Sequence, residues 1–363
     1  MSPNIERLER EIHATADPVA RAELYAQLAG YLVRTGFFEE SRRILGDLRA
    51  DFSHGRNPRV SVWIMFVEGL LHYYAEFSPK AMERMRGAQA IALASNCAPI
   101  AALASAWKAQ FEFEASKFDA MTESLKIALS HAEENDHDAL SRIGIILCNA
   151  FEYCSNKVQV QHWFRRTHAH AVASGDQASI EALQHNRAVI RISALFVGQC
   201  FNELDSESLR FMKTEISSAM GLQALIGINA LTNQILLAQA QLQIIEGKFT
   251  QAIDTLLRVP DLRPYASHNY CRELIDLEIG YSLFRSGQMD AALHRCTGLD
   301  TSAFDRLDTD DRLVAAWMRR CMCRADARQG DARTAQSEFL AARRRYVEQR
   351  RHLANLLSAF ELA

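Results

Sequence analysis

Three arginines at helical spacing could hold an anion. Arg320, Arg324 and Arg328 lie four residues apart, so a helix would carry them on one face. Like charges at this spacing repel each other, and an anionic partner would explain them, because arginine forms forked hydrogen bonds with carboxylates. The alternative is a solvated face that Asp326 and Asp331 partly neutralise.

A row of aromatic side chains could grip the apolar side chains of a partner. It consists of Trp63, Phe66, Tyr73 and Tyr74, with Leu70 between them. The alternative is that this row belongs to the core, because an apolar stripe at helical spacing usually marks the buried face of a helix.

Two pairs of polar residues complete the predicted partner-binding set. Asn149 and Tyr153 lie four residues apart, and so do Arg187 and Arg191. An asparagine in a groove could hold the backbone of an extended peptide, because its amide offers both a donor and an acceptor.

Motifs typical of catalysis or metal binding are absent from the sequence. It contains no Walker-type phosphate loop, no Gly-x-Ser-x-Gly elbow, no dinucleotide fingerprint and no His-Glu-x-x-His zinc helix. His168 and His170 are two residues apart, so a helix directs them to different faces. The same holds for Cys321 and Cys323. We expect no catalytic residue, no metal and no cofactor. An enzyme would need a site built from distant residues that leaves no motif.

The segment Arg343–Arg351 contains five arginines, with Glu348 as its one acidic residue. A basic helix can follow the phosphates of a nucleic acid. However, no recognition motif flanks it, and the last helix of a repeat array needs a polar outer face. We therefore expect a solvated cap and no nucleic-acid partner, in keeping with the net charge of −3.

A pattern of residues that occurs twice in the sequence predicts the helices that carry these side chains. The first copy consists of Ala240, Gly247, Phe249, Ala252, Leu256 and Val259. The second copy keeps every interval 40 residues later and consists of Gly280, Gly287, Met289, Ala292, Cys296 and Leu299. A unit that recurs at a fixed period indicates a repeat architecture. Each unit is predicted to be a helix, a tight turn in which glycine accepts a positive φ, and a second helix.

The same intervals predict about eight such units. Turn residues of further units are Gly36, Ser116 and Gly330. The predicted segments are a repeat array at 1–342, with an N-terminal cap at 1–16 and weaker repeats at 140–221, and a basic C-terminal capping helix at 343–363. One unit cannot bury its apolar face alone, so the stack of units is the stable structure.

These residues resemble the tetratricopeptide repeat, in which a small residue, a turn glycine, and then alanine and large residues recur across two helices. The period near 40 is similar to that of the arrays in MalT-type and peptide-sensing bacterial regulators. The resemblance implies an all-α, right-handed superhelical solenoid whose first helices line a concave groove. It places the predicted partner-binding residues on those first helices.

Composition agrees with a soluble, folded protein in the cytoplasm. Hydrophobic residues make up 48% of the chain and charged residues 23%. Residues 1–11 carry charges and no apolar segment, so they do not resemble a secretory signal. The most apolar stretches, 91–107 and 221–242, contain polar residues that interrupt a membrane span. The eight cysteines are scattered, which predicts small buried side chains in a reducing compartment rather than disulfides.

The sequence therefore predicts a non-enzymatic scaffold or adaptor that binds a protein or peptide in its groove. That partner would carry acidic residues or a free carboxylate. The alternative is a ligand- or peptide-sensing regulatory subunit that switches a separate effector. A sensor should hold a compact pocket enclosed by several repeats, whereas an adaptor should keep an open groove. Such a pocket would be expected at the irregular units four and five.

Overall fold

The chain is all-helical over the residues that the structure describes. The computed structural model describes residues 3–52, 57–76, 78–204, 206–226, 232–259, 271–325 and 329–362. These contain α-helices, two short 3₁₀ helices and no strand. The first nine α-helices are α1 (Pro3–Ala14), α2 (Pro18–Arg34), α3 (Phe38–Asp51), α4 (Pro58–Tyr74), α5 (Lys80–Ala94), α6 (Ala98–Glu114), α7 (Phe118–His131), α8 (His137–Tyr153) and α9 (Lys157–Ala173). The remainder are α10 (Gln177–Phe201), α11 (Ser206–Ile226), α12 (Thr232–Ile245), α13 (Phe249–Leu257), α14 (Arg272–Arg285), α15 (Met289–Cys296), η1 (Thr301–Arg306), α16 (Thr309–Ala325), α17 (Gln329–Leu357) and η2 (Ser358–Phe360).

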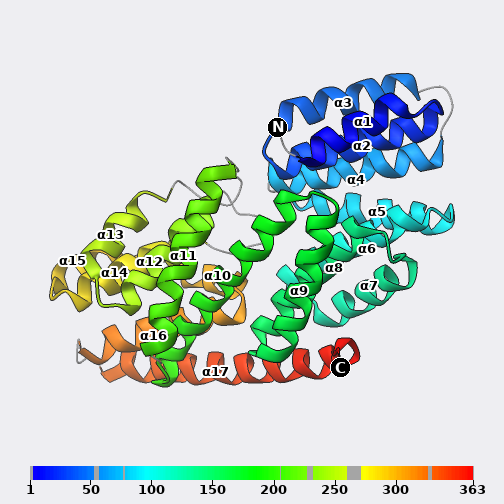
Figure 1. Cartoon of the computed structure of the whole chain (residues 1–363). Helices are drawn as coiled ribbons and strands as arrows, with labels where there is room; N and C mark the ends of the chain where they lie inside the picture. The colour runs from blue at the N-terminus through cyan, green and yellow to red at the C-terminus, as the bar shows by residue number, and fades with distance from the viewer. Residues whose placement is uncertain are drawn as a thin grey trace.

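From α2 onward the helices pack in sequential pairs, as the repeat pattern predicts. The pairs run from α2–α3, which we call unit one, to α16–α17, which we call unit eight. First helices also pack on first helices of other units: α2 on α4, α6 on α8, α8 on α10, α10 on α12 and α14 on α16. Figure 1 shows the pairs following one another from the N-terminal helices at one end to α13–α15 at the other. This packing of neighbouring pairs is compatible with a helical repeat.

The turns within the units have the predicted backbone conformation. Gly36, Gly247 and Gly287 have φ of 89°, 75° and 84°, a region that residues with a side chain rarely adopt. In units three and four, Ser116 and Ser155 occupy this region with φ of 55° and 58°. The glycine spacing in the sequence therefore located real helix-to-helix turns.

Close contact between the two helices of a unit depends on small residues. Gly144 on α8 faces Thr167 on α9, and a Cβ added at Gly144 would overlap the Thr167 Oγ1. Thr167 is fully buried and donates to the Trp163 carbonyl at 2.6 Å, so it has no room to withdraw. Gly280 is placed in the same way against Cys296 in unit seven.

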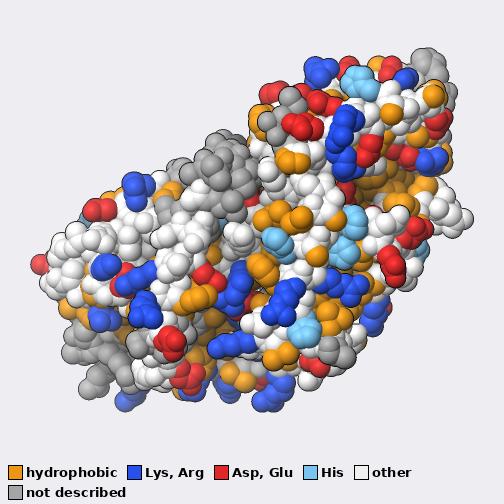
Figure 2. Space-filling view, in the orientation of Figure 1, with side chains coloured by type: hydrophobic (Ala, Val, Ile, Leu, Met, Phe, Trp, Pro, Cys, Tyr) orange, Lys and Arg blue, Asp and Glu red, His pale blue; other side chains and the backbone are white. Residues whose placement is uncertain are grey.

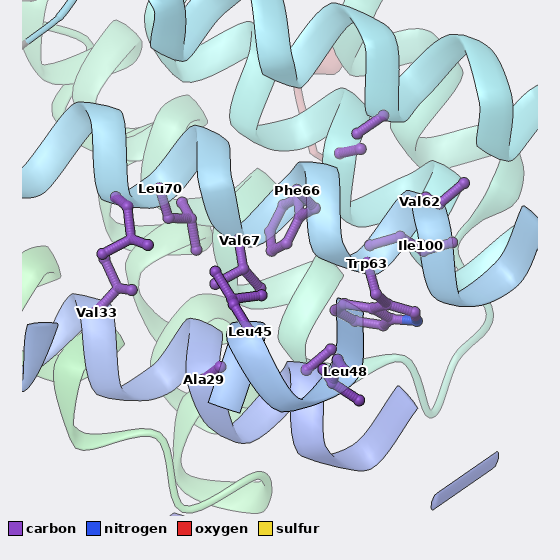
Figure 3. Close-up of a cluster of buried hydrophobic side chains, with 14 of the residues drawn as sticks. Ala29, Val33, Leu45, Leu48, Val62, Trp63, Phe66, Val67, Leu70 and Ile100 are labelled. Atoms are coloured by element: carbon purple, nitrogen blue, oxygen red, sulfur yellow. The ribbon is translucent and has the colours of Figure 1, made fainter. Parts of the chain in front are cut away.

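The core between units one and two contains part of the predicted aromatic row. Trp63 and Phe66 are 8% and 2% exposed, and they pack among side chains of α2 and α3 (Figure 3). The expectation that they are exposed in a groove is therefore wrong. They are buried because α4 lies along α2, and this part of the aromatic row faces that contact.

Helix α17 extends well beyond unit eight and returns to the middle of the chain. Its residues Leu353 and Leu357, with Phe360 of η2, are buried in one cluster with side chains of α7, α8 and α9. The Trp163 Nε1 donates to the Phe360 carbonyl at 3.1 Å. The side chain of Gln159 bonds to both the amide and the carbonyl of Leu362. In Figure 1, α17 runs along one edge of the molecule and ends beside α9.

The expected solvated cap is therefore wrong for part of the basic segment 343–351. Arg350 forms a buried ion pair with Asp310 of α16 and stacks on the ring of Tyr153 of α8. Arg343 stacks on Phe201 of α10. The helix joins units because its arginines contact acidic and aromatic residues elsewhere in the fold.

A second closing contact joins unit one to unit five. Arg34, at the end of α2, makes a forked ion pair with Asp176, the N-cap of α10, at 2.8 and 3.0 Å. It also donates to Ser179 at 2.8 Å. Burial would raise the pKa of Asp176, but Arg34 and the bonds from Ser179 hold it below its ordinary value. First helices of units one to five line two hollows that share Trp107, and this salt bridge joins the first and the last of those helices around one interior.

We predict that Gly144→Ala lowers the free energy of unfolding by about 1–3 kcal/mol, because the added methyl group must displace a buried, hydrogen-bonded side chain. Gly46→Ala on α3 is the control, since no atom lies within 4 Å of the added Cβ. It should raise the stability by up to about 1 kcal/mol through helix propensity. Urea denaturation followed by circular dichroism measures both, and equal effects would contradict the packing argument.

We also predict that Arg34→Met lowers the stability by about 3–5 kcal/mol, because it leaves Asp176 buried without its partner. The double variant Arg34→Met/Asp176→Asn should recover part of that loss. The control is Arg43→Met, whose ion pair with Asp47 is exposed and should contribute less than about 1 kcal/mol. If Arg34→Met behaves like Arg43→Met in urea denaturation, this salt bridge does not close the interior.

Candidate functional site

A pocket lies among the first helices of units two to six. About 640 Å³ of space not filled by atoms lies among its side chains, and part of that space is open to solvent. We call it the central pocket. Its lining residues are Tyr73 and Tyr74 of α4; Trp107, Gln110, Phe113 and Glu114 of α6; Arg142 and Asn149 of α8; Ala182, Asn186, Val189 and Ile190 of α10; and Gln234 of α12. Five helices far apart in the sequence therefore form one site.

Aromatic rings form one side of the central pocket. The rings of Tyr73 and Tyr74 meet edge to face with centroids 4.8 Å apart, and Tyr74 meets Trp107 in the same way at 6.0 Å. Tyr73 also lies 4.8 Å from Phe111. The predicted aromatic row is thus divided, since Trp63 and Phe66 belong to the core and the two tyrosines face the pocket.

Arg142 brings a buried positive charge to the pocket. Its side chain lies 3.7 Å from the centre of the Trp107 ring, and the residue is 4% exposed. Its Nη2 atom is buried and has no hydrogen-bond partner. Among the described residues, no carboxylate lies within 4.0 Å of its guanidinium. Burial, followed by the charge of Arg34, lowers the pKa of Arg142 to about 10. Such a buried charge is costly unless something pairs with it.

The pocket also holds acceptors that are only partly used. The Glu114 Oε1 accepts from the Tyr73 hydroxyl at 2.6 Å and from the Gln110 Nε2 at 2.8 Å. The Glu114 Oε2 and the Gln110 Oε1 are buried and have no hydrogen-bond partner. Asn149, one of the predicted partner-binding residues, is 4% exposed and lines the same pocket. The pocket therefore presents both a donor and acceptors.

The other predicted residues of units four and five are engaged inside the protein. Arg191 donates to Glu152 and to Glu215 at 2.8 Å each. Arg187 lies 3.9 and 3.6 Å from the same carboxylates. Burial alone would lower the pKa of Arg191, but its bonds to the two carboxylates raise it. These arginines join α8, α10 and α11. The prediction that their side chains are available to a protein or peptide partner is therefore not met.

Tyr153 is also engaged within the protein. Its hydroxyl donates to Asp310 at 2.9 Å, and its ring stacks against Arg350. The site thus contains Tyr73, Tyr74 and Asn149 of the predicted set, and Tyr153 belongs to the contact that holds α17.

The predicted arginine row of unit eight is described only at Arg320. Its guanidinium stacks on Phe339 of α17, 4.4 Å from the ring centre. The side chain of Arg324 and the whole of Arg328 lie outside the described residues. The anion-binding role of this row therefore stays a prediction.

Arg142, Trp107, Gln110 and Glu114 were not among the predicted residues. One signal was present in the sequence, because Arg142 is the single charged residue in the stretch 139–151. The other was the spacing of three and four residues from Trp107 to Gln110 to Glu114, which places all three on one helix face.

Known proteins give no further identification. No protein-family model and no curated protein matches this chain. Among the described residues, no group of three or more His, Cys, Asp and Glu side chains is arranged to hold a metal ion. The described helices include none long and apolar enough to cross a membrane. The surface seen in Figure 2 intersperses basic and acidic side chains with apolar ones.

We predict that Arg191→Met lowers the free energy of unfolding by about 2 kcal/mol or more, because it removes two charge-assisted hydrogen bonds and leaves both carboxylates short of a partner. Lys126→Met is the control, since its ion pair with Glu123 is exposed and within one helix. Thermal and urea denaturation measure both variants. If Arg191→Met is as stable as the wild type, Arg191 returns to the set of residues available to a partner.

Proposed function

We propose that this chain is a non-enzymatic, tetratricopeptide-like regulatory protein that binds a small ligand or short peptide in its central pocket. The binding event would be passed to a separate effector protein in the cytoplasm. The observation that carries this proposal is the pocket itself, which five first helices form together. Binding pockets in proteins are concave and combine apolar walls with polar groups that orient the ligand. This pocket combines seven aromatic and aliphatic residues with six polar or charged ones.

The position of the pocket gives it a means to act on the whole array. A ligand there touches units two to six at once, so it favours one relative placement of those units. The proposed solenoid would be right-handed and superhelical, and a change of its curvature would alter the surface offered to an effector. The salt bridge of Arg34 with Asp176 supports this coupling, because it joins unit one to unit five and Arg34 lines the neighbouring hollow that shares Trp107 with the central pocket.

The adaptor function is the second candidate, and one observation favours it. A hollow of about 800 Å³ between unit seven and unit eight is lined largely by apolar side chains of α14, α15 and α16. Met289 and Leu293 in this hollow are 37% and 40% exposed. Exposed apolar surface of this kind is typical of protein contacts.

The test uses a variant that fills the central pocket. Asn186→Trp places a large ring among the lining residues of α10, and Ala194→Trp places the same ring on an exposed position of the same helix. Wild type, Asn186→Trp and Ala194→Trp are screened by thermal shift against short peptides and small metabolites.

We predict that ligands raise the melting temperature of the wild type and of Ala194→Trp by several degrees, because they bind the folded state alone. Asn186→Trp should fold but show no shift. A ligand that stabilises Asn186→Trp as much as the wild type would contradict the assignment of the pocket. If no ligand raises the melting temperature and affinity purification with the wild type captures a protein partner, the adaptor function gains support.

A further inference from the structure

We propose that the central pocket binds an amino-acid-type ligand whose carboxylate pairs with Arg142 and whose N–H groups donate to Glu114 and Gln110. This inference rests on the proposed function, since it names the ligand class of the same pocket. The chemistry is shared by a free amino acid and by the C-terminal residue of a peptide. The experiment below distinguishes these two sources.

Three other arginines are largely buried, and they differ from Arg142 in their partners. Arg34, Arg191 and Arg350 each contact at least one carboxylate, namely Asp176, Glu152 with Glu215, and Asp310. Arg142 is the most buried of the four, and its guanidinium has a ring beneath it and, among the described residues, no carboxylate beside it. A stacked ring offsets only a small part of the cost of burying a charge. A ligand carboxylate would give Arg142 the partner that the other three arginines have within the fold.

Two acceptors in the pocket also lack a hydrogen-bond partner. The Glu114 Oε2 and the Gln110 Oε1 are buried in the same pocket without a donor. A buried acceptor that lacks a donor is destabilising, so a fitting ligand supplies one. A ligand that satisfies the whole pocket therefore accepts from Arg142 and donates to α6. An amino acid carries an anionic group and N–H donors on adjacent atoms.

The charge of the pocket lining disfavours a more highly charged anion. The pocket lining contains one guanidinium and one carboxylate, Arg142 and Glu114. A phosphate dianion would be repelled by Glu114 and would find one arginine, whereas phosphate sites usually gather several donors or cations. The balanced charge of the lining suits a zwitterion or a monoanion that carries donors. The aromatic side formed by Tyr73, Tyr74 and Trp107 would hold the apolar part of the ligand.

The experiment compares Arg142→Met with Arg34→Met in the full chain. Without ligand, Arg142→Met should melt at or above the wild-type temperature, because it removes a buried charge that nothing in the fold neutralises. Arg34→Met should melt lower, because it breaks a buried salt bridge. If Arg142→Met melts as low as Arg34→Met, Arg142 is a structural residue and the inference is wrong.

Binding is measured by ligand-observed NMR with three matched probe sets. These are the twenty amino acids, their N-acetyl derivatives and their C-terminal amides. Free amino acids or N-acetyl amino acids should bind the wild type, and the corresponding amides should bind at least tenfold more weakly. Arg142→Met should bind acids and amides with equal affinity. Tighter binding of the free amino acids identifies that source, and tighter binding of the N-acetyl acids identifies a peptide terminus. Equal binding of acids and amides, or binding of neither, would overturn the inference.

The two proposals fail separately. Suppose that a neutral ligand binds the wild type and Arg142→Met but does not bind Asn186→Trp. The ligand then occupies the central pocket, and the proposed carboxylate site at Arg142 is wrong. Acids that bind Asn186→Trp as well as the wild type would instead refute the pocket assignment.

Discussion

The forked ion pair between Arg34 and Asp176 is the contact on which the interior depends. Helix-pair stacking alone leaves the relation between unit one and unit five free, because each unit touches mainly its neighbours. The ion pair removes that freedom by tying the end of α2 to the start of α10. Because both groups are buried, the pair needs good geometry to offset its desolvation, and the bond from Arg34 to Ser179 adds to it.

Much of the fold could be predicted from the sequence because helix pairs are local. Gly247 and Gly287 recur 40 residues apart, and each adopts the positive φ that the turn requires. The closing contacts could not be predicted in this way. Leu353 packs near Trp163, and nothing in either segment indicates the other. Periodicity reports which face of a helix is apolar, but it does not report which distant helix covers that face.

The candidate site was predictable only in part, for a related reason. Tyr73, Tyr74 and Asn149 line the central pocket because first helices form it, and their role in binding stays a prediction. Arg187 and Arg191 looked available, since their partners Glu152 and Glu215 lie on other helices. Arg142 was overlooked because a single charge in an apolar helix has no spacing to interpret. Charges can be assigned to binding or to structure only when every neighbour in space is known.

The return of α17 has a consequence for how the protein is made. Leu353, Leu357 and Phe360 complete a core whose other members belong to units three and four, with Leu183 of unit five. Those units leave the ribosome long before α17 is synthesised, and proteins generally begin folding from the N-terminus during synthesis. Until α17 is synthesised, units three and four therefore remain with the Trp163 side chain incompletely buried. During that interval the nascent chain presents an apolar surface for which a chaperone can compete with the chain's own last helix.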